Sequence, residues 1–143
     1  KLIMIGDGPE RANIESLTRS LCTLKDVMFI GKIPDVENVL HNADLFLLTS
    51  EKESFGLSAL EAMASSVPVI SSNAGGLPEL VQDGVSGYTC DIGDVNAMSE
   101  KAIEILDKKN INLFKNNAFR TASKYDINVI LPKYIEFYKK ILN

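Results

Sequence analysis

Short apolar runs alternate along the chain with longer segments in which apolar residues recur at helical spacing. The runs are mostly β-branched or aromatic and continuous, which is typical of strands covered on both faces. They predict strands at residues 2–5, 27–30, 45–48, 67–71 and 88–90. The remaining segments predict helices at residues 10–22, 36–42, 57–64, 78–82, 95–107, 111–123 and 128–142.

This alternation of strands and helices predicts an α/β fold. Parallel strands joined by right-handed helical crossovers form a doubly wound sheet. The 143 residues suit one ordinary domain, and no repeat, low-complexity tract or linker interrupts them. We therefore expect residues 1–143 to be a single domain. Because the chain opens directly on a strand with Lys1, we also expect it to be a fragment of a longer protein.

The charge is acidic overall but uneven along the chain. The net charge of −4 argues against nucleic acid, because proteins that bind it usually carry a basic face. Residues 1–107 hold 17 acidic and 7 basic residues, whereas residues 108–143 hold 2 and 8. The basic end is either a solvated helical face or a weak contact surface for a partner or an acidic membrane.

Two further sequence features concern the surroundings of the protein. No apolar run approaches the roughly 20 residues that span a bilayer, so we expect no transmembrane segment. Cys22 and Cys90 are far apart and outside any C-x-x-C spacing. Free thiols in a reducing compartment are therefore expected, and with them a cytoplasmic location.

The loop before the predicted helix at 57–64 has the most informative chemistry. Sites in parallel sheets lie at the carboxyl ends of the strands, and helix N-termini there suit phosphate groups. Gly56 lacks the Cβ that would block a ligand, and Glu53 lies just before the helix. Glu61 lies one turn into the helix, where a carboxylate can accept hydrogen bonds from vicinal hydroxyls. A merely solvated helix start is the equal alternative.

Other loops carry weaker signals. Residues 6–9 form a turn that lacks the third glycine of a dinucleotide fingerprint, and residues 75–76 suit either a turn or the wall of a ligand site. The loop Gly31, Lys32 and Ile33 can present backbone groups to a planar base. The sequence has no H-E-x-x-H motif and no Asp-x-Asp pair after a strand, so we expect neither a metal nor a cofactor.

Taken together, these motifs resemble those of glycosyltransferase family 4. Residues 50–64 are similar to the E-x7-E region of this family, with Glu53 and Glu61 at the required spacing. The similarity continues at residues 6–10, 29–31, 67–70, 75–79 and 83–88, in the family's order. Within the family, residues 50–57 most resemble the N-acetylglucosaminyl malate synthases of bacillithiol formation.

The resemblance implies the GT-B fold, in which two Rossmann-like domains face each other across a cleft. The chain would be most of the C-terminal domain, which holds the nucleotide sugar. The N-terminal acceptor domain and the Arg and Lys that neutralise the diphosphate would lie before Lys1. The implied reaction retains anomeric configuration without a metal. The implied donor is UDP-N-acetylglucosamine, the acceptor is a small hydroxylated molecule such as malate, and the fragment alone is inactive.

The resemblance also implies a role for each site residue. Glu61 would bind the ribose hydroxyls, and Glu53 would contact the donor sugar near its reacting carbon as the catalytic glutamate. The backbone amides of Phe55, Gly56 and Leu57 would hold the diphosphate and sugar. The base would rest beside the loop Gly31, Lys32 and Ile33.

Two other classes of function stay open from the sequence. One is a stand-alone nucleotide- or phosphate-binding module without catalysis. The other is an interaction domain that uses the basic helical end. A receiver domain, which is also doubly wound, fits less well because it needs an acidic pair after the first strand, where this chain has Gly6, Asp7 and Gly8.

Overall fold

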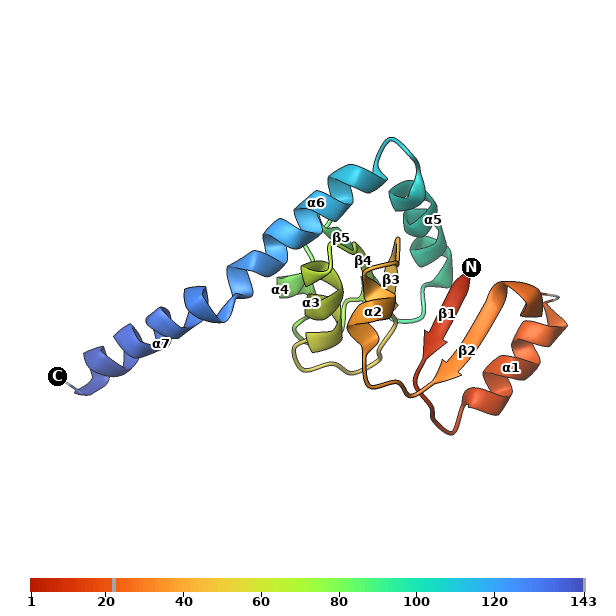
Figure 1. Ribbon diagram of the computed structural model, residues 1–143, viewed down its shortest axis with the longest axis horizontal. Helices are drawn as coiled ribbons and strands as arrows, with labels where there is room; N and C mark the ends of the chain where they lie inside the picture. The colour runs from red at the N-terminus through yellow and green to blue at the C-terminus, as the bar shows by residue number, and fades with distance from the viewer. Residues whose placement is uncertain (22, 143) are drawn as a thin grey trace. The chain divides into compact units, whose positions relative to one another are not determined.

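The computed structural model describes residues 1–21 and 23–142. These form two compact units, Lys1–Val36 and Glu37–Asn143, and each is described here by itself. The first unit contains β1 (Leu2–Ile5), α1 (Arg11–Ser20), the short 3-10 helix η1 (Leu24–Asp26) and β2 (Val27–Gly31) (Figure 1). Strands β1 and β2 pair in parallel, and beyond β1 the Gly6 N–H donates to the Gly31 carbonyl at 2.8 Å.

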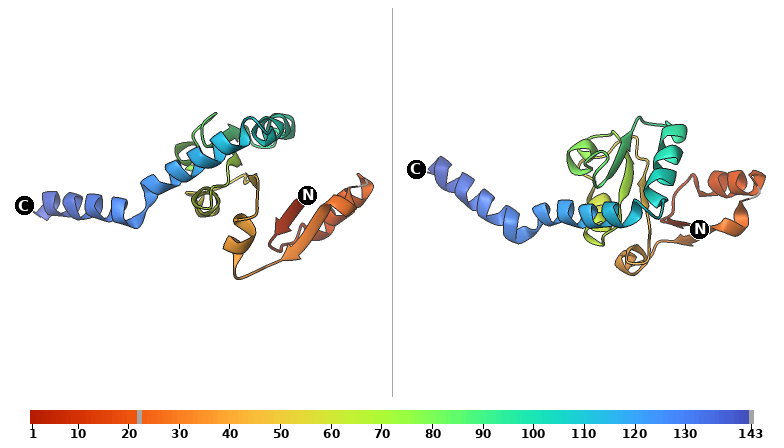
Figure 2. Two further views of the ribbon diagram at one scale, coloured as in Figure 1. Left: turned by 45° about the horizontal axis from the view of Figure 1, so that its top comes forward. Right: turned by 90° about the horizontal axis from the view of Figure 1, so that it is seen from above.

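The second unit is built on a three-stranded parallel sheet with the order β3-β4-β5. Its elements are α2 (Val36–Leu40), β3 (Phe46–Leu48), α3 (Leu57–Ala64), β4 (Val69–Ser72), α4 (Leu77–Leu80), β5 (Gly87–Cys90), α5 (Val95–Leu106), α6 (Ile111–Ala122), the 3-10 helix η2 (Ser123–Tyr125) and α7 (Ile127–Leu142). Figure 2 (right) shows α5 on one side of this sheet and α4 on the other. The predicted α/β class with parallel pairing is confirmed.

Some strand and helix boundaries differ from those that the apolar runs predict. Strand β4 begins at Val69 instead of residue 67, because Pro68 has no N–H for the ladder. The Val67 N–H instead donates to the Ala62 carbonyl of α3, at 2.9 Å. Helix α1 ends at Ser20, short of the predicted residue 22, and Cys22 itself lies outside the described residues.

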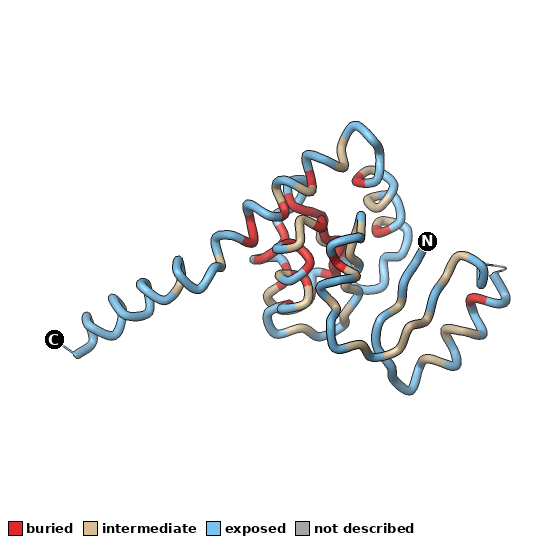
Figure 3. The backbone as a smooth tube through the Cα atoms, in the orientation of Figure 1, coloured by how far each residue is buried: buried red, intermediate tan, exposed pale blue. Residues whose placement is uncertain are grey.

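The core of the second unit lies around its central strand. All four residues of β4 are buried (Figure 3). On one face Ile70 joins a cluster made with β5, α5 and α6, whose other buried members are Cys90, Met98, Ile105 and Phe114. Helix α3 packs against β3 and β4, and it buries Ala59, Ala62 and Met63.

The expectation that the apolar runs form strands covered on both faces is wrong for β1 and β3. In β1 the side chains of Leu2, Ile3 and Ile5 are exposed, and in β3 Leu47 is exposed. These strands lie at the edges of their sheets, whereas β4 has a neighbour on each side. A continuous apolar run therefore predicts a strand in this chain but does not predict how deeply that strand is buried.

Helix α7 makes little contact with the rest of its unit. None of its residues is buried, and both views of Figure 2 show it extending away from the β3–β5 sheet. Its apolar residues include Leu131, Tyr134, Ile135 and Phe137, all exposed. No helix of the described residues is long and apolar enough to cross a membrane.

Candidate functional site

The loop between β3 and α3 leads into a helix whose N-terminus has no side-chain cap. Gly56 is the N-cap residue of α3 and has a φ of 92°, a left-handed conformation that favours glycine. Within the part of the chain that the structure describes, no side chain caps this helix. The first intrahelical bond runs from the Leu60 N–H to the Gly56 carbonyl at 3.0 Å. The N–H groups of the first helical turn therefore have no intrahelical acceptor, and such groups can bind an anion.

Gly56 also packs tightly against α4. A Cβ at this position would lie 2.5 Å from Cδ2 of Leu77 and 3.6 Å from Cδ2 of Leu80, and both leucines are fully buried. The glycine is thus required by packing as well as by its φ. This contact fixes the position of the α3 N-terminus relative to α4.

The two glycines at 75 and 76 support the same loop from the other side. A Cβ on Gly75 would fall 1.6 Å from the carbonyl oxygen of Glu53, and one on Gly76 would fall 2.8 Å from that of Ser54. The Gly76 N–H donates to the Ser54 carbonyl at 3.2 Å. These glycines therefore have a structural role, because they allow the backbone of the β3–α3 loop to pack closely against them.

A buried hydroxyl holds the beginning of the loop. Ser72, the last residue of β4, is fully buried, and its Oγ donates to the carbonyl of Ser50. The β3–α3 loop is therefore attached to β4 at its start and to the loop after β4 at its end. A loop backbone that is held at both ends suits a binding site whose N–H groups must point in fixed directions.

The two predicted glutamates both lie on this part of the second unit. Glu53 is half-buried, and its Oε1 accepts a hydrogen bond from the Ser54 N–H at 3.1 Å. Glu61 is exposed on α3, one turn beyond the helix start. Along the chain, Glu53 therefore precedes the start of α3 and Glu61 follows it by one turn. The proposed roles of both residues stay predictions.

Two apolar side chains lie at the opening. Phe55 is 39% exposed and Leu57 is 66% exposed, although both are large and apolar. The ring of Phe55 contacts the ring of Tyr125 edge to face, with centroids 5.9 Å apart. No sequence pattern indicates Tyr125, because its contact with the loop is long-range and no spacing connects it with Phe55.

The remaining predicted site residues belong to the first unit. Gly31 ends β2 with a φ of 70°, and the exposed Lys32 and half-buried Ile33 follow it outside regular structure. The Gly31 carbonyl is already used by the Gly6 N–H. The described geometry thus groups the site residues into two sets, each within one unit.

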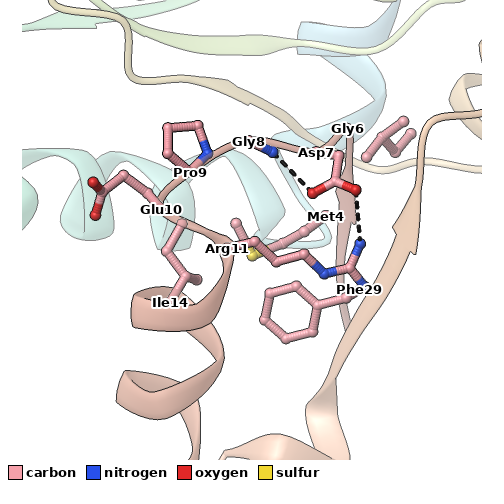
Figure 4. Close-up of a pocket in the computed structure, with 10 residues that line it drawn as sticks. Met4, Gly6, Asp7, Gly8, Pro9, Glu10, Arg11, Ile14 and Phe29 are labelled. Carbon is pink, nitrogen blue, oxygen red and sulfur yellow. Dashed lines mark hydrogen bonds and ion pairs between the residues drawn. The ribbon is translucent and has the colours of Figure 1, made fainter.

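A hollow of about 330 Å³ in the first unit lies beside the turn at residues 6–9 (Figure 4). Its polar groups pair with one another. The Asp7 carboxylate accepts from the Gly8 N–H at 2.9 Å and lies 3.6 Å from the Arg11 guanidinium. Arg11 also donates to Glu15 at 2.9 Å, and this hydrogen bond raises the pKa of Arg11. The turn thus satisfies its own charges, in agreement with the structural role favoured from the sequence.

The described residues hold no group of three or more metal-ligating side chains. Cys90 is a free, buried thiol, and burial raises its pKa. This thiol packs in the core cluster with Ile70. It therefore behaves as a small apolar side chain.

Comparison with known proteins identifies the family. The family model described as "Glycosyl transferases group 1" matches residues 1–124. The chain is 45% identical over 112 residues to N-acetyl-alpha-D-glucosaminyl L-malate synthase from Bacillus anthracis, which covers 78% of the chain and 29% of that protein. It is 32% identical over 142 residues to 2-deoxystreptamine N-acetyl-D-glucosaminyltransferase from Niallia circulans, which covers 96% and 36%.

A solved structure shows the same fold. The crystal structure of Anabaena HepE in complex with UDP matches 96% of this chain and 40% of that protein, with a TM-score of 0.81 and 29% identity. The chain spans about a third of the length of the curated relatives named above. Its structural neighbours are GT-B glycosyltransferases. The resemblance drawn from the sequence is confirmed: the chain belongs to the glycosyl transferases group 1 family.

Proposed function

We propose that this chain is the nucleotide-sugar-binding domain of a retaining glycosyltransferase. The proposed donor is UDP-N-acetylglucosamine, and the proposed acceptor is a small hydroxy acid such as malate. The observation that carries the proposal is the N-terminus of α3, which has no side-chain cap, with Gly56 in a left-handed conformation and with Glu53 before it and Glu61 after it in the chain. The names of the two curated relatives, both N-acetylglucosaminyltransferases, support the sugar.

In this proposal the helix start holds the diphosphate. The partial positive charge at a helix N-terminus and its free N–H groups stabilise an anion. As the bond to the sugar breaks, negative charge grows on the leaving diphosphate, and fixed donors then contribute most. The loop contacts of Gly56, Gly75 and Gly76 keep these donors in place before the substrate arrives.

The two glutamates divide the remaining tasks. Glu61 accepts hydrogen bonds from the ribose hydroxyls, which orients the nucleotide along α3. Glu53 orients the sugar near its reacting carbon. We assign it this positioning role and no covalent bond to the sugar. The amides of Phe55, Gly56 and Leu57 contact the diphosphate and sugar, and the loop Gly31, Lys32 and Ile33 flanks the base.

We further propose that residues 1–143 act as one domain of a longer cytoplasmic protein. The length of the relatives supports this, because the chain spans only about a third of it. An N-terminal domain would supply the acceptor site and the cationic phosphate ligands. The exposed lysines of α7 support a weak additional contact with an acidic membrane surface, for which Lys133, Lys139 and Lys140 are the candidates.

The reaction tests this proposal. The full-length protein is incubated with UDP-N-acetylglucosamine and malate, and the anomeric configuration of the product is read by NMR. We expect an α-linked product, and Glu53→Ala should lower turnover more than it lowers nucleotide affinity. If the protein binds UDP but transfers no sugar to any hydroxy acid in a panel, the acceptor assignment is wrong. If it also transfers sugar to no other acceptor and does not hydrolyse the donor, it is a non-catalytic nucleotide-binding module.

A further inference from the structure

Tyr125 connects the end of helix α6 with the loop that begins α3. It is the last residue of η2, two residues before the start of α7, and it is half-buried. Its ring meets that of Phe55 edge to face, with centroids 5.9 Å apart and planes at 69°. The final turns of α6 run beside α3, so the contact joins elements that are already neighbours.

The hydroxyl of Tyr125 has a partner of its own. It donates to the carbonyl of Glu79 in α4 at 3.2 Å. Helix α4 also carries Leu77, the fully buried side chain against which Gly56 packs. Tyr125 therefore contacts both structures that flank the N-terminus of α3, namely the β3–α3 loop and α4.

We propose that Tyr125 is a positioning residue for the phosphate-binding end of α3. Its ring limits the movement of Phe55, which directly precedes the N-cap residue Gly56, and the bond to Glu79 fixes the ring. The inference rests on the proposed function, since it concerns the same diphosphate. Phe55 is more than one-third exposed, and without the contact with Tyr125 its side chain would have several staggered rotamers open to it.

The effect of such a residue is specific to the phosphate groups. Tyr125 touches the loop that holds the diphosphate, whereas the ribose is assigned to Glu61 and the base to residues 31–33. Removal of the ring should weaken UDP binding about three- to tenfold, the range expected for one aromatic pair. Binding of uridine, which has no phosphate, should be unchanged.

The test compares UDP and uridine on the full-length protein by calorimetry and competition. Tyr125→Leu removes the ring, whereas Tyr125→Phe keeps the ring and loses only the hydrogen bond to Glu79, so its UDP affinity should lie between those of Tyr125→Leu and the wild type. Tyr134→Leu, at an exposed tyrosine on α7, is the matched control and should bind both ligands normally. The thermal midpoint of each variant is measured in parallel.

The outcomes separate this inference from the proposed function. If the wild type binds no UDP, the proposed function fails and the inference fails with it. If the wild type binds UDP and Tyr125→Leu binds it equally well, or loses UDP and uridine to the same extent, the inference alone is overturned. Should Tyr125→Leu not fold, Phe55→Leu removes the same ring contact by changing the more accessible partner. Its binding of UDP and of uridine is then judged in the same way.

Discussion

The backbone of Gly75 lies so close to that of Glu53 that a Cβ at residue 75 would stand 1.6 Å from the Glu53 carbonyl oxygen. The loop after β4 therefore serves as a support for the loop after β3. The site of this domain depends on that backbone contact as much as on any side chain, because the proposed phosphate ligands are main-chain N–H groups.

A methyl group at residue 75 should displace the β3–α3 loop. Gly75→Ala adds both the overlap with Glu53 and the strain of a φ of 54°, which together should cost more than the 1–3 kcal/mol or so of backbone strain alone. Gly93→Ala is the matched control, since Gly93 has a φ of 81° but no atom within 4 Å of its Cβ position. Urea unfolding of both variants gives the difference, and equal losses would show that the contact with Glu53 is unimportant.

Glu61 should matter to the nucleoside part of the ligand. Glu61→Ala leaves the ribose hydroxyls without an acceptor, so UDP affinity should fall by roughly 1–3 kcal/mol while stability changes little. Glu100→Ala, an exposed carboxylate on α5, controls for the loss of one negative charge. Calorimetric titration measures both, and a Glu61 variant that binds like the Glu100 variant would favour a solvated helix start.

Two adjacent serines of β4 should respond differently to the loss of their hydroxyls. Both are fully buried, but Ser72 donates to the Ser50 carbonyl, whereas Ser71 Oγ has no hydrogen-bond partner among the described residues. Ser72→Ala should lower the free energy of unfolding by about 1–3 kcal/mol, and Ser71→Ala should be neutral or stabilising. A Ser71 variant as damaging as the Ser72 variant would reveal a partner for the Ser71 hydroxyl.

Glu104 should give the stability of the second unit a pH dependence. Its carboxylate accepts from the Tyr88 hydroxyl and from Lys101 at 2.9 Å, and these hydrogen bonds, the one from Tyr88 first, hold the pKa of Glu104 below its usual range. A lowered carboxyl pKa contributes stability above the unfolded value of about 4.3, and this is lost as the pH falls through the folded value.

Glu104→Gln should therefore lower the thermal midpoint at neutral pH, and its difference from the wild type should narrow as the solution is acidified. Glu100→Gln on the same helix serves as the control. Thermal unfolding followed at several pH values measures the effect. A difference that stays constant from neutral to acidic pH would show that the carboxylate charge is not involved.

The sequence predicts the elements of this fold well because each has a local cause. The apolar run at 2–5 and the helical spacing at 57–64 match β1 and α3 to the residue. The exposure of Leu47 does not follow from its run, because burial depends on which elements pack against β3. Strand order is a tertiary property that no local pattern contains.

The candidate site is partly visible in the sequence for the same reason. Gly56 and Glu61 are close along the chain to the helix they serve, so their spacing indicates their place. The supporting contacts of Gly75 with Glu53 and of Tyr125 with Phe55 join distant segments. The sequence shows two glycines and a tyrosine there but does not show what they touch.

Nucleotide selectivity is the most direct test of the proposal that this chain binds a uridine nucleotide sugar. The full-length protein is titrated with UDP, GDP and ADP under identical conditions, and the titration with UDP is repeated on Glu61→Ala. We predict that UDP binds most tightly of the three nucleotides and that Glu61→Ala weakens the binding of UDP. Tighter binding of GDP or ADP would contradict the uridine assignment, and binding of none of the three would contradict the assignment of this chain as a nucleotide-sugar-binding domain.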